Sequence, residues 1–206
     1  MEKRKEIPDI IVGRLPRYLR VLINLKETKV TTNSHELGLL LGYSAAQVRK
    51  DLSQFGGFGK QGTGYNIESL INNLEEILNV KVPRGIVLVG IGNLGKAILH
   101  YKGFEKHGFY IAGAFDDDPD LEGVLIGNCK VKSQKMLRSF IQENNIQIAM
   151  ITTPASEAQK VAEELVASGI SAILSYATTI LKLPEEIRVE YSDPIILLQH
   201  MTYYLD

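Results

Sequence analysis

The sequence has one cysteine, no tryptophan and no long apolar stretch among its 206 residues. With Cys129 alone an internal disulfide is impossible, and such sparing use of cysteine fits a reducing cytosol. No window of about 18 apolar residues occurs, so no membrane-spanning helix is expected. The charged residues 1–6 lead into no apolar stretch, so no secretory signal is expected either. One cysteine and four scattered histidines give no metal-ligand spacing. These absences predict a cytoplasmic protein without a disulfide, a metal site or a membrane span.

Charge is unevenly distributed along the chain. Residues 1–65 contain 11 Lys and Arg against 6 Asp and Glu, a net charge of +5, whereas residues 66–206 contain 12 against 18, a net charge of −6. The length and the apolar fraction of 45% are comfortable for two domains. A basic first third is typical of a module that binds a polyanion, although ordinary surface scatter would give the same count.

The first third of the chain has the spacing of a helix-turn-helix. A first helix carries apolar residues at helical spacing, with Pro16 in its first turn. Two short helices follow, over about 35–41 with Ser34 as its N-cap and over about 45–55 with Ser44 as its N-cap. The glycine-rich stretch 56–65 is typical of a short hairpin or wing.

The remainder of the chain alternates between strands and helices. After an amphipathic helix over 67–79 and a joint at 82–85, this alternation predicts an α/β domain with a doubly wound parallel Rossmann sheet. The expected strands are 86–90, 109–115, 129–132, 147–152, 171–174 and 187–191. The expected helices are 93–106, 133–144, 156–168 and 194–205.

A glycine-rich turn after the first of these strands has the order that a dinucleotide requires. The motif is Gly90-Ile91-Gly92-Asn93-Leu94-Gly95, and Asp116 ends the second strand 21 residues later. Gly90 turns the chain, Gly92 leaves room for the pyrophosphate at the helix N-terminus, and Gly95 lets the helix approach the strand. Asp116 can accept both ribose hydroxyls and repel a 2′-phosphate, which favours NAD(H) over NADP(H). The alternative is that the glycines only make a turn and that 116–118 are a solvated acidic cap.

The end of the fourth strand is a second candidate contact for the cofactor. Thr152, Thr153 and Pro154 lie where open α/β sheets bind ligands, so a contact near the nicotinamide is expected, although a plain strand-end turn is an equal alternative. No Ser/His/Asp set and no His–acid pair follows a strand. Few residues remain for a substrate domain, so we expect a protein that binds a cofactor without catalysing a reaction.

The third helix has the composition of a DNA-recognition helix. Ala45, Val48 and Leu52 share an inward face. Arginine reads guanine, glutamine reads adenine and lysine meets phosphate, so the outward residues are candidates for DNA contacts, although a basic solvated helix face is the alternative. The candidates are Ser44, Ala46, Gln47, Arg49, Lys50, Ser53 and, in or beside the wing, Lys60, Gly62 and Tyr65.

Taken together, these stretches resemble the bacterial family of redox-sensing transcriptional repressors called Rex. The resemblance covers nearly the whole chain. It is carried by Arg14-Leu15-Pro16-x-Tyr18, by Ala46-Gln47-Val48-Arg49-Lys50-Asp51-Leu52-Ser53-x-Phe55-Gly56, by Phe58-Gly59-x-x-Gly62-x-Gly64-Tyr65, by the glycine motif and by Ala114-Phe115-Asp116-x-Asp118-Pro119.

The resemblance implies a homodimer with a winged-helix domain (1–80), a Rossmann NAD(H)-binding domain (81–193) and a C-terminal helix (194–206) exchanged between subunits. It also implies that the protein senses the NADH/NAD+ ratio: NADH binds and operator DNA is released. The family's switch residues fall on Arg14, Tyr101 and Asp193, with Tyr101 near the cofactor. We expect an Arg14–Asp193–Tyr101 contact that NADH breaks, while Asp193 can equally be the N-cap of the last helix, with Pro194 at its first position.

Two segments depart from the family pattern, and two other functions fit parts of the sequence. Tyr176-Ala177-Thr178 stands where the family often has Phe-Ala-Pro, and Ser192-Asp193-Pro194-Ile195 where it usually has Val-Asp-Leu-Ala. A small NAD-dependent oxidoreductase with a basic assembly module would consume NADH and ignore DNA sequence. A DNA-binding regulator with a changed ligand would lack a use for Gly90, Gly92, Gly95 and Asp116.

Overall fold

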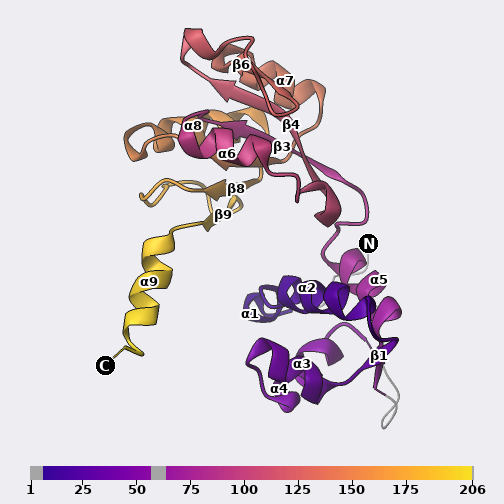
Figure 1. The fold of residues 1–206 in the computed structure, drawn as a ribbon. Coiled ribbons are helices and arrows are strands. Elements are labelled where there is room, and N and C mark those ends of the chain that lie inside the picture. The colour runs from indigo at the N-terminus through magenta and orange to yellow at the C-terminus, as the bar shows by residue number, and fades with distance from the viewer. Residues whose placement is uncertain (1–6, 57–63, 206) are drawn as a thin grey trace. The chain divides into compact units, whose positions relative to one another are not determined.

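The chain forms two compact units, residues 1–81 and 82–206, and each is described here by itself (Figure 1). The computed structural model describes residues 7–56 and 64–205. The predicted wing residues 57–63, with Lys60 and Gly62, lie outside the described residues. None of the described helices is long and apolar enough to cross a membrane.

The N-terminal unit is helical, with a two-stranded ribbon. Its core is built from apolar faces of four helices, α2 to α5, and includes Leu22, Leu37, Val48 and Leu74. The expected helix-turn-helix is confirmed. The elements are α1 (Asp9–Val12), α2 (Leu15–Lys26), β1 (Thr31–Thr32), α3 (Ser34–Leu41), α4 (Ala45–Ser53), β2 (Tyr65–Asn66) and α5 (Ile67–Ile77). β1 and β2 pair antiparallel, so the chain before α3 lies beside the chain before α5.

The N-caps of the two short helices were predicted with mixed success. Ser44 caps α4 as expected, its hydroxyl accepting a hydrogen bond from the Gln47 N–H at 3.1 Å. The prediction for α3 was wrong, because Asn33 is the cap: its backbone is extended and its side chain accepts from the N–H groups of His35 and Glu36. Gly42 ends α3 with a φ of 72°, a conformation that favours glycine.

The C-terminal unit is built on a seven-stranded sheet with the order β5-β6-β4-β3-β7-β8-β9. Every neighbouring pair is parallel except β5 with β6, which form an antiparallel hairpin. The predicted doubly wound sheet is confirmed. The strands are β3 (Arg84–Val89), β4 (Phe109–Asp116), β5 (Leu125–Ile126), β6 (Cys129–Ser133), β7 (Ile148–Ile151), β8 (Ala172–Ser175) and β9 (Arg188–Tyr191).

Helices cover both faces of this sheet, and alternate residues of the strands separate the two cores. Val87 and Val89 face the core of α7 (Leu137–Glu143) and α8 (Ala155–Ser168). Ile86 and Leu88 face the core that contains Ile98 of α6 (Asn93–His100). The chain from β8 to β9 has no helix, and the last helix is α9 (Pro194–Thr202).

The helix after β3 is shorter than the predicted 93–106. It ends at His100, Tyr101 is extended, and a 3₁₀ turn follows at η1 (Glu105–His107). The turn between β5 and β6 lies against the end of α6, since a Cβ built on Gly127 would be 2.5 Å from the carbonyl oxygen of Leu99. A second expected helix, 133–144, begins as the 3₁₀ turn η3 (Gln134–Met136). The last helix is also shorter than predicted, ending at Thr202 instead of 205.

Candidate functional site

Three glycines, two in the turn between β3 and α6 and one in the first turn of α6, have different surroundings. Gly90 has a φ of 93°, and a Cβ there would lie 2.7 Å from the Thr153 nitrogen. A Cβ on Gly95 would lie 2.2 Å from the carbonyl oxygen of Gly90. A Cβ on Gly92 would meet no atom within 4 Å, so the space in front of the α6 N-terminus is open. No side chain caps that helix at Gly92, and its first N–H groups and dipole face this space. The geometry fits the phosphates of a dinucleotide.

Asp116 ends β4 beside this turn, and its carboxylate is held by backbone groups. Oδ2 accepts a hydrogen bond from the Ile91 N–H at 2.5 Å, and Oδ1 accepts from the Asp118 N–H at 2.9 Å. The acid is therefore fixed at the carboxyl end of the strand, as ribose recognition requires.

The third wall is the turn after β7. The Thr152 hydroxyl donates to the Gly90 carbonyl at 2.5 Å, which ties this turn to the glycine turn. The Thr153 hydroxyl is buried and has no hydrogen-bond partner within the described chain. A buried polar atom without a partner is unfavourable, so this hydroxyl is suited to a bound ligand.

These three walls enclose one cleft of about 540 Å³. Among the predicted cofactor residues, those that line it are Gly90, Gly92, Asp116, Thr152, Thr153 and Pro154. The sequence analysis missed others, which are Ile91, Lys96, Leu121, Gln134, Glu157, Lys160 and Val161. Lys96 follows the glycine motif directly, so its position one turn into the phosphate-binding helix could have identified it.

The remaining predicted cofactor residues do not line this cleft. Asn93 and Leu94 begin α6, and Gly95 is buried between helix and turn. Tyr101 follows the opposite end of α6 and lines a separate cavity of about 370 Å³ with Cys129. Burial raises the pKa of the Cys129 thiol, which makes it a poor nucleophile at neutral pH. The role of Tyr101 near the cofactor stays a prediction.

In the N-terminal unit, α4 divides into a buried and an exposed face. Val48, Asp51 and Leu52 are buried, whereas Ala46, Arg49, Lys50 and Ser53 are exposed. The Arg49 guanidinium donates to the Ser34 hydroxyl at 3.0 Å, so it lies across the start of α3. Gln47 and Tyr65 are partly buried, and burial raises the pKa of Tyr65. The exposed face is the one available to DNA.

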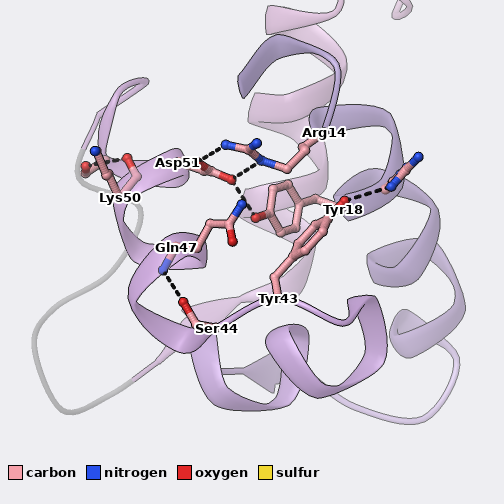
Figure 2. Close-up of polar contacts among 9 residues, drawn as sticks. Arg14, Tyr18, Tyr43, Ser44, Gln47, Lys50 and Asp51 are labelled. Carbon is pink, nitrogen blue, oxygen red and sulfur yellow. Dashed lines mark hydrogen bonds and ion pairs between the residues drawn. The ribbon is translucent and has the colours of Figure 1, made fainter. Parts of the chain in front are cut away.

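The buried face of α4 contains an ion pair that the sequence analysis did not predict. Arg14 donates from Nε to Asp51 Oδ2 and from a terminal nitrogen to Oδ1, both at 2.7 Å, and the Tyr18 hydroxyl donates to Oδ2 at 2.8 Å (Figure 2). The hydrogen bond to Asp51 raises the pKa of Arg14 against the opposing effect of burial. Burial, followed by the hydrogen bond to Asp51, raises the pKa of Tyr18.

A recognisable signal for this pair exists in the sequence. Val48, Asp51, Leu52 and Phe55 have the i, i+3, i+4, i+7 spacing of a core face, and one of them is charged. A carboxylate in that position requires a buried partner.

Asp193 is the N-cap of α9, which confirms one of the two roles expected for this residue. Its side chain accepts from the Ile195 N–H at 2.9 Å, and Pro194 occupies the first turn. The Tyr101 ring is more than half exposed and lies edge-on to Phe104. The Arg14–Asp193–Tyr101 contact would join the two units and stays a prediction.

Comparison with known proteins covers both units. Residues 81–179 match the family model described as CoA binding domain, and residues 6–53 match the one described as Putative DNA-binding protein N-terminus. The redox-sensing transcriptional repressor Rex of Chloroflexus aurantiacus (strain ATCC 29366 / DSM 635 / J-10-fl) is 47% identical over 206 residues, which is 100% of this chain and 97% of that protein. The Rex of Brevibacillus brevis (strain 47 / JCM 6285 / NBRC 100599) is 38% identical over 206 residues, 100% of both proteins.

The chain belongs to the Rex family.

Solved Rex structures match along the same length. RSP, a Rex-family repressor, in complex with β-NAD+ and operator DNA is 39% identical with a TM-score of 0.91, covering 98% of this chain and 93% of that chain. RSP in complex with β-NADH is 37% identical with a TM-score of 0.88, covering 98% of this chain and 95% of that chain. The Rex similarity therefore includes both the glycine turn and α4.

Proposed function

We propose that this chain is a redox-sensing transcriptional repressor that binds operator DNA as a homodimer and is released when NADH binds. The observation that carries the proposal is the sequence similarity, along the whole chain, to curated repressors of that name. RSP, which matches across both units, has been crystallised with β-NADH and with β-NAD+ and operator DNA. A DNA-recognition helix and a dinucleotide cleft in one chain are what such a sensor needs. No catalytic step is part of the proposal, and its site of action on DNA implies the bacterial cytoplasm.

NADH and NAD+ are the proposed ligands of the cleft at Gly92. The pyrophosphate would lie at the α6 N-terminus, the adenosine ribose at Asp116 and the nicotinamide side towards Thr152, Thr153 and Pro154. The oxidised ring carries a positive charge and the reduced ring is neutral, so an apolar pocket for the ring favours NADH unless an acid offsets that charge. Any shift in DNA binding is limited by the difference in affinity between the two conformations.

The exposed face of α4 is the proposed reader of the operator. Arg49 and Gln47 would read base edges, and Ser44, Ala46, Lys50 and Ser53 would lie along the backbone or the groove floor. Lys60, Gly62 and Tyr65 would add wing contacts. In a dimer with two-fold symmetry the operator is a palindrome whose half-sites lie one or more helical turns apart.

The dimer is proposed to form through an exchanged α9. The large apolar residues of this segment are all at least half exposed within one chain: Ile195, Ile196, Leu197, Leu198, Met201, Tyr203, Tyr204 and Leu205. A terminal helix that is apolar on most faces needs a partner on most faces. The helix-free passage from β8 to β9 supports the same proposal, because one sheet face there has no helix from its own crossover.

The switch residues are proposed to be Arg14, Tyr101 and Asp193. In the DNA-competent form an Arg14–Asp193–Tyr101 contact would hold the arrangement, and NADH would break it. In Asp193→Ala we expect weaker operator binding without NADH than in wild type, and a smaller further loss when NADH is added. Unchanged release would remove this mechanism and leave Asp193 only its role as a helix cap.

Gel shift with wild-type protein tests the proposed function. A panel of palindromic duplexes is titrated with NADH and, separately, with NAD+. We expect one or a few duplexes to be retained, and NADH to release them at concentrations where NAD+ does not. Retention of no palindrome, or full retention in saturating NADH, would exclude the proposal. Consumption of NADH with a carbonyl substrate would favour an oxidoreductase instead.

A further inference from the structure

Asp51 is a charged residue on the buried face of α4, away from the exposed side chains that are proposed to face DNA. The Asp51 side chain is 1% exposed and that of Arg14 is 15% exposed. An unpaired buried charge is strongly unfavourable, and pairing it with a guanidinium removes most of that penalty without adding net stability over an apolar contact. The pair is therefore better explained by specificity of arrangement than by stability.

The geometry fixes α4 in a way that apolar contacts cannot. The planar guanidinium of Arg14 meets both carboxylate oxygens, which defines direction as well as distance. Tyr18 adds a third hydrogen bond from the next turn of α2. Val48 and Leu52 could slide or rotate against the core by small amounts. The three hydrogen bonds to Asp51, in contrast, can all form only at a single position and orientation of the helix.

A second layer fixes the turn before α4 to the same helix. The Arg17 guanidinium donates to the Tyr43 hydroxyl at 3.0 Å, and the Tyr43 ring lies edge-on to Tyr18 with 5.9 Å between ring centres. The Arg14 guanidinium lies 6.0 Å from the centre of the same ring. Both ends of the turn-and-helix segment are thus held on α2 (Figure 2).

The residues that face DNA follow directly from this arrangement. Arg49 and Lys50 are the two residues before Asp51, and Figure 2 shows Lys50 pointing away from the Arg14–Asp51 pair. Side chains of one helix keep fixed angular offsets from each other, so a rotation of α4 that takes Asp51 out of its site turns the DNA-facing residues through the same angle.

We propose that Asp51 is a positioning residue for operator recognition, through which Arg14 holds the recognition helix in its reading position. The proposal rests on the proposed function. Breaking the Arg14–Asp51 pair would leave Asp51 buried and unpaired, and the recognition helix would lose the contact that fixes it.

The decisive variant is Asp51→Asn, which keeps the shape of the side chain and an acceptor for Tyr18 while removing the charge. Removing an acidic charge from a unit that binds DNA would by itself tighten binding, since attraction to phosphate increases. A positioning role predicts the opposite sign. The matched control is Glu68→Gln, which also changes an acid to its amide. Glu68 lies on α5 and forms an exposed ion pair with Lys26.

Affinity is measured for a palindromic duplex selected by the wild-type protein from a random pool, and for a scrambled duplex of equal length. In Asp51→Asn we expect affinity for the selected duplex to fall at least about tenfold, comparable to the loss of one base contact. Affinity for the scrambled duplex and the slope of log K against log salt should stay near wild type, since no phosphate contact is lost. Glu68→Gln should bind both duplexes at least as well as wild type.

Arg14→Lys provides a second test that does not depend on the folding of Asp51→Asn. Lysine keeps the charge but cannot form the two-pronged contact, so an intermediate loss confined to the selected duplex is expected. The double variant should lose no more than Asp51→Asn alone, because both changes break one interaction.

Unchanged affinity for the selected duplex in both variants, or equal losses on both duplexes, would overturn the inference. If wild type itself selects no duplex, or if NADH never releases the selected duplex, the proposed function fails and the inference about Asp51 fails with it. If wild type is selective and NADH-responsive and the variants match it, only the role of Asp51 is wrong.

Discussion

At the scale of single residues, two glycines of the same turn have opposite surroundings. Gly92 borders open space, whereas a Cβ on Gly95 would lie 2.2 Å from the carbonyl oxygen of Gly90. In Gly92→Ala we expect NADH affinity to fall at least about tenfold with an unchanged melting temperature, because the methyl group enters the phosphate space. In Gly95→Ala we expect the melting temperature to fall by several degrees, since about 1–3 kcal/mol of strain enters the core.

Fluorescence titration and differential scanning calorimetry separate the two effects. Equal destabilisation by both substitutions, or undiminished NADH binding by Gly92→Ala, would contradict the assignment of the cleft.

Asp116 should control the choice between NADH and NADPH. In Asp116→Asn the preference for NADH is expected to shrink at least about tenfold, because the carboxylate no longer repels a 2′-phosphate or accepts two ribose hydrogen bonds. Asp120→Asn is the control, since Asp120 is exposed nearby and does not line the cleft. Calorimetric titration with both cofactors gives the ratio. A preference that changes equally in the two variants would show a general charge effect.

The buried Tyr18 hydroxyl should make the N-terminal unit sensitive to alkali. Its pKa is raised above the ordinary value of 10.0, so the folded state keeps the proton where the unfolded chain releases it. The contribution is complete below pH 10 and is lost as the pH rises, by about 1.4 kcal/mol per pH unit at most. Urea unfolding of wild type and Tyr18→Phe between pH 8.5 and about 11 should show a steeper fall for wild type. Parallel curves would contradict this linkage.

At the scale of elements, the last helix has apolar residues exposed along its whole length within the described chain. Its residues Ile196 and Leu197 are 60% and 67% exposed. The double substitution Ile196→Lys, Leu197→Lys is expected to convert dimers into monomers, because it places two charges in an apolar interface. Gln199→Lys, on the same helix, is the control for added charge. Sedimentation equilibrium gives the mass, and dimers that persist in the double variant would exclude α9 as the main contact.

The elements also show how much could be predicted from the sequence. Apolar periodicity located the helix-turn-helix and every strand of the parallel sheet except the short β5, since these depend on local spacing. The length of α6 could not be predicted from local spacing, and its end packs closely against Gly127, a residue 27 positions further along. Asp51 was assigned only to a motif, since its partner Arg14 lies 37 residues away. The glycine turn and Asp116 lie at one cleft, as their spacing predicts, and their binding of a cofactor stays a prediction. Lys96 and Lys160 could be placed at this cleft only from the fold.

At the scale of the whole molecule, charge separates the two units. Residues 1–81 have a net charge of +3, with +5 in the first 65, and residues 82–206 have a net charge of −4, so phosphate contacts should come from the N-terminal unit. Operator affinity is expected to fall by about 10³-fold or more between 50 and 200 mM salt if about six phosphates are neutralised in the dimer. NADH binding in the cleft should change little over this range. A flat salt dependence of the operator complex would rule out a phosphate-dominated interface.

The exposed apolar end of the chain has a consequence for how the protein is made. If α9 is exchanged as proposed, a newly synthesised copy has this helix uncovered until it meets a second copy, so the melting temperature should rise with protein concentration. Once two such tails are interlocked, separating them requires uncovering both at once. Dimers assembled on one polysome should then persist for long periods. A defective subunit would therefore impair a normal subunit only when the two are translated side by side.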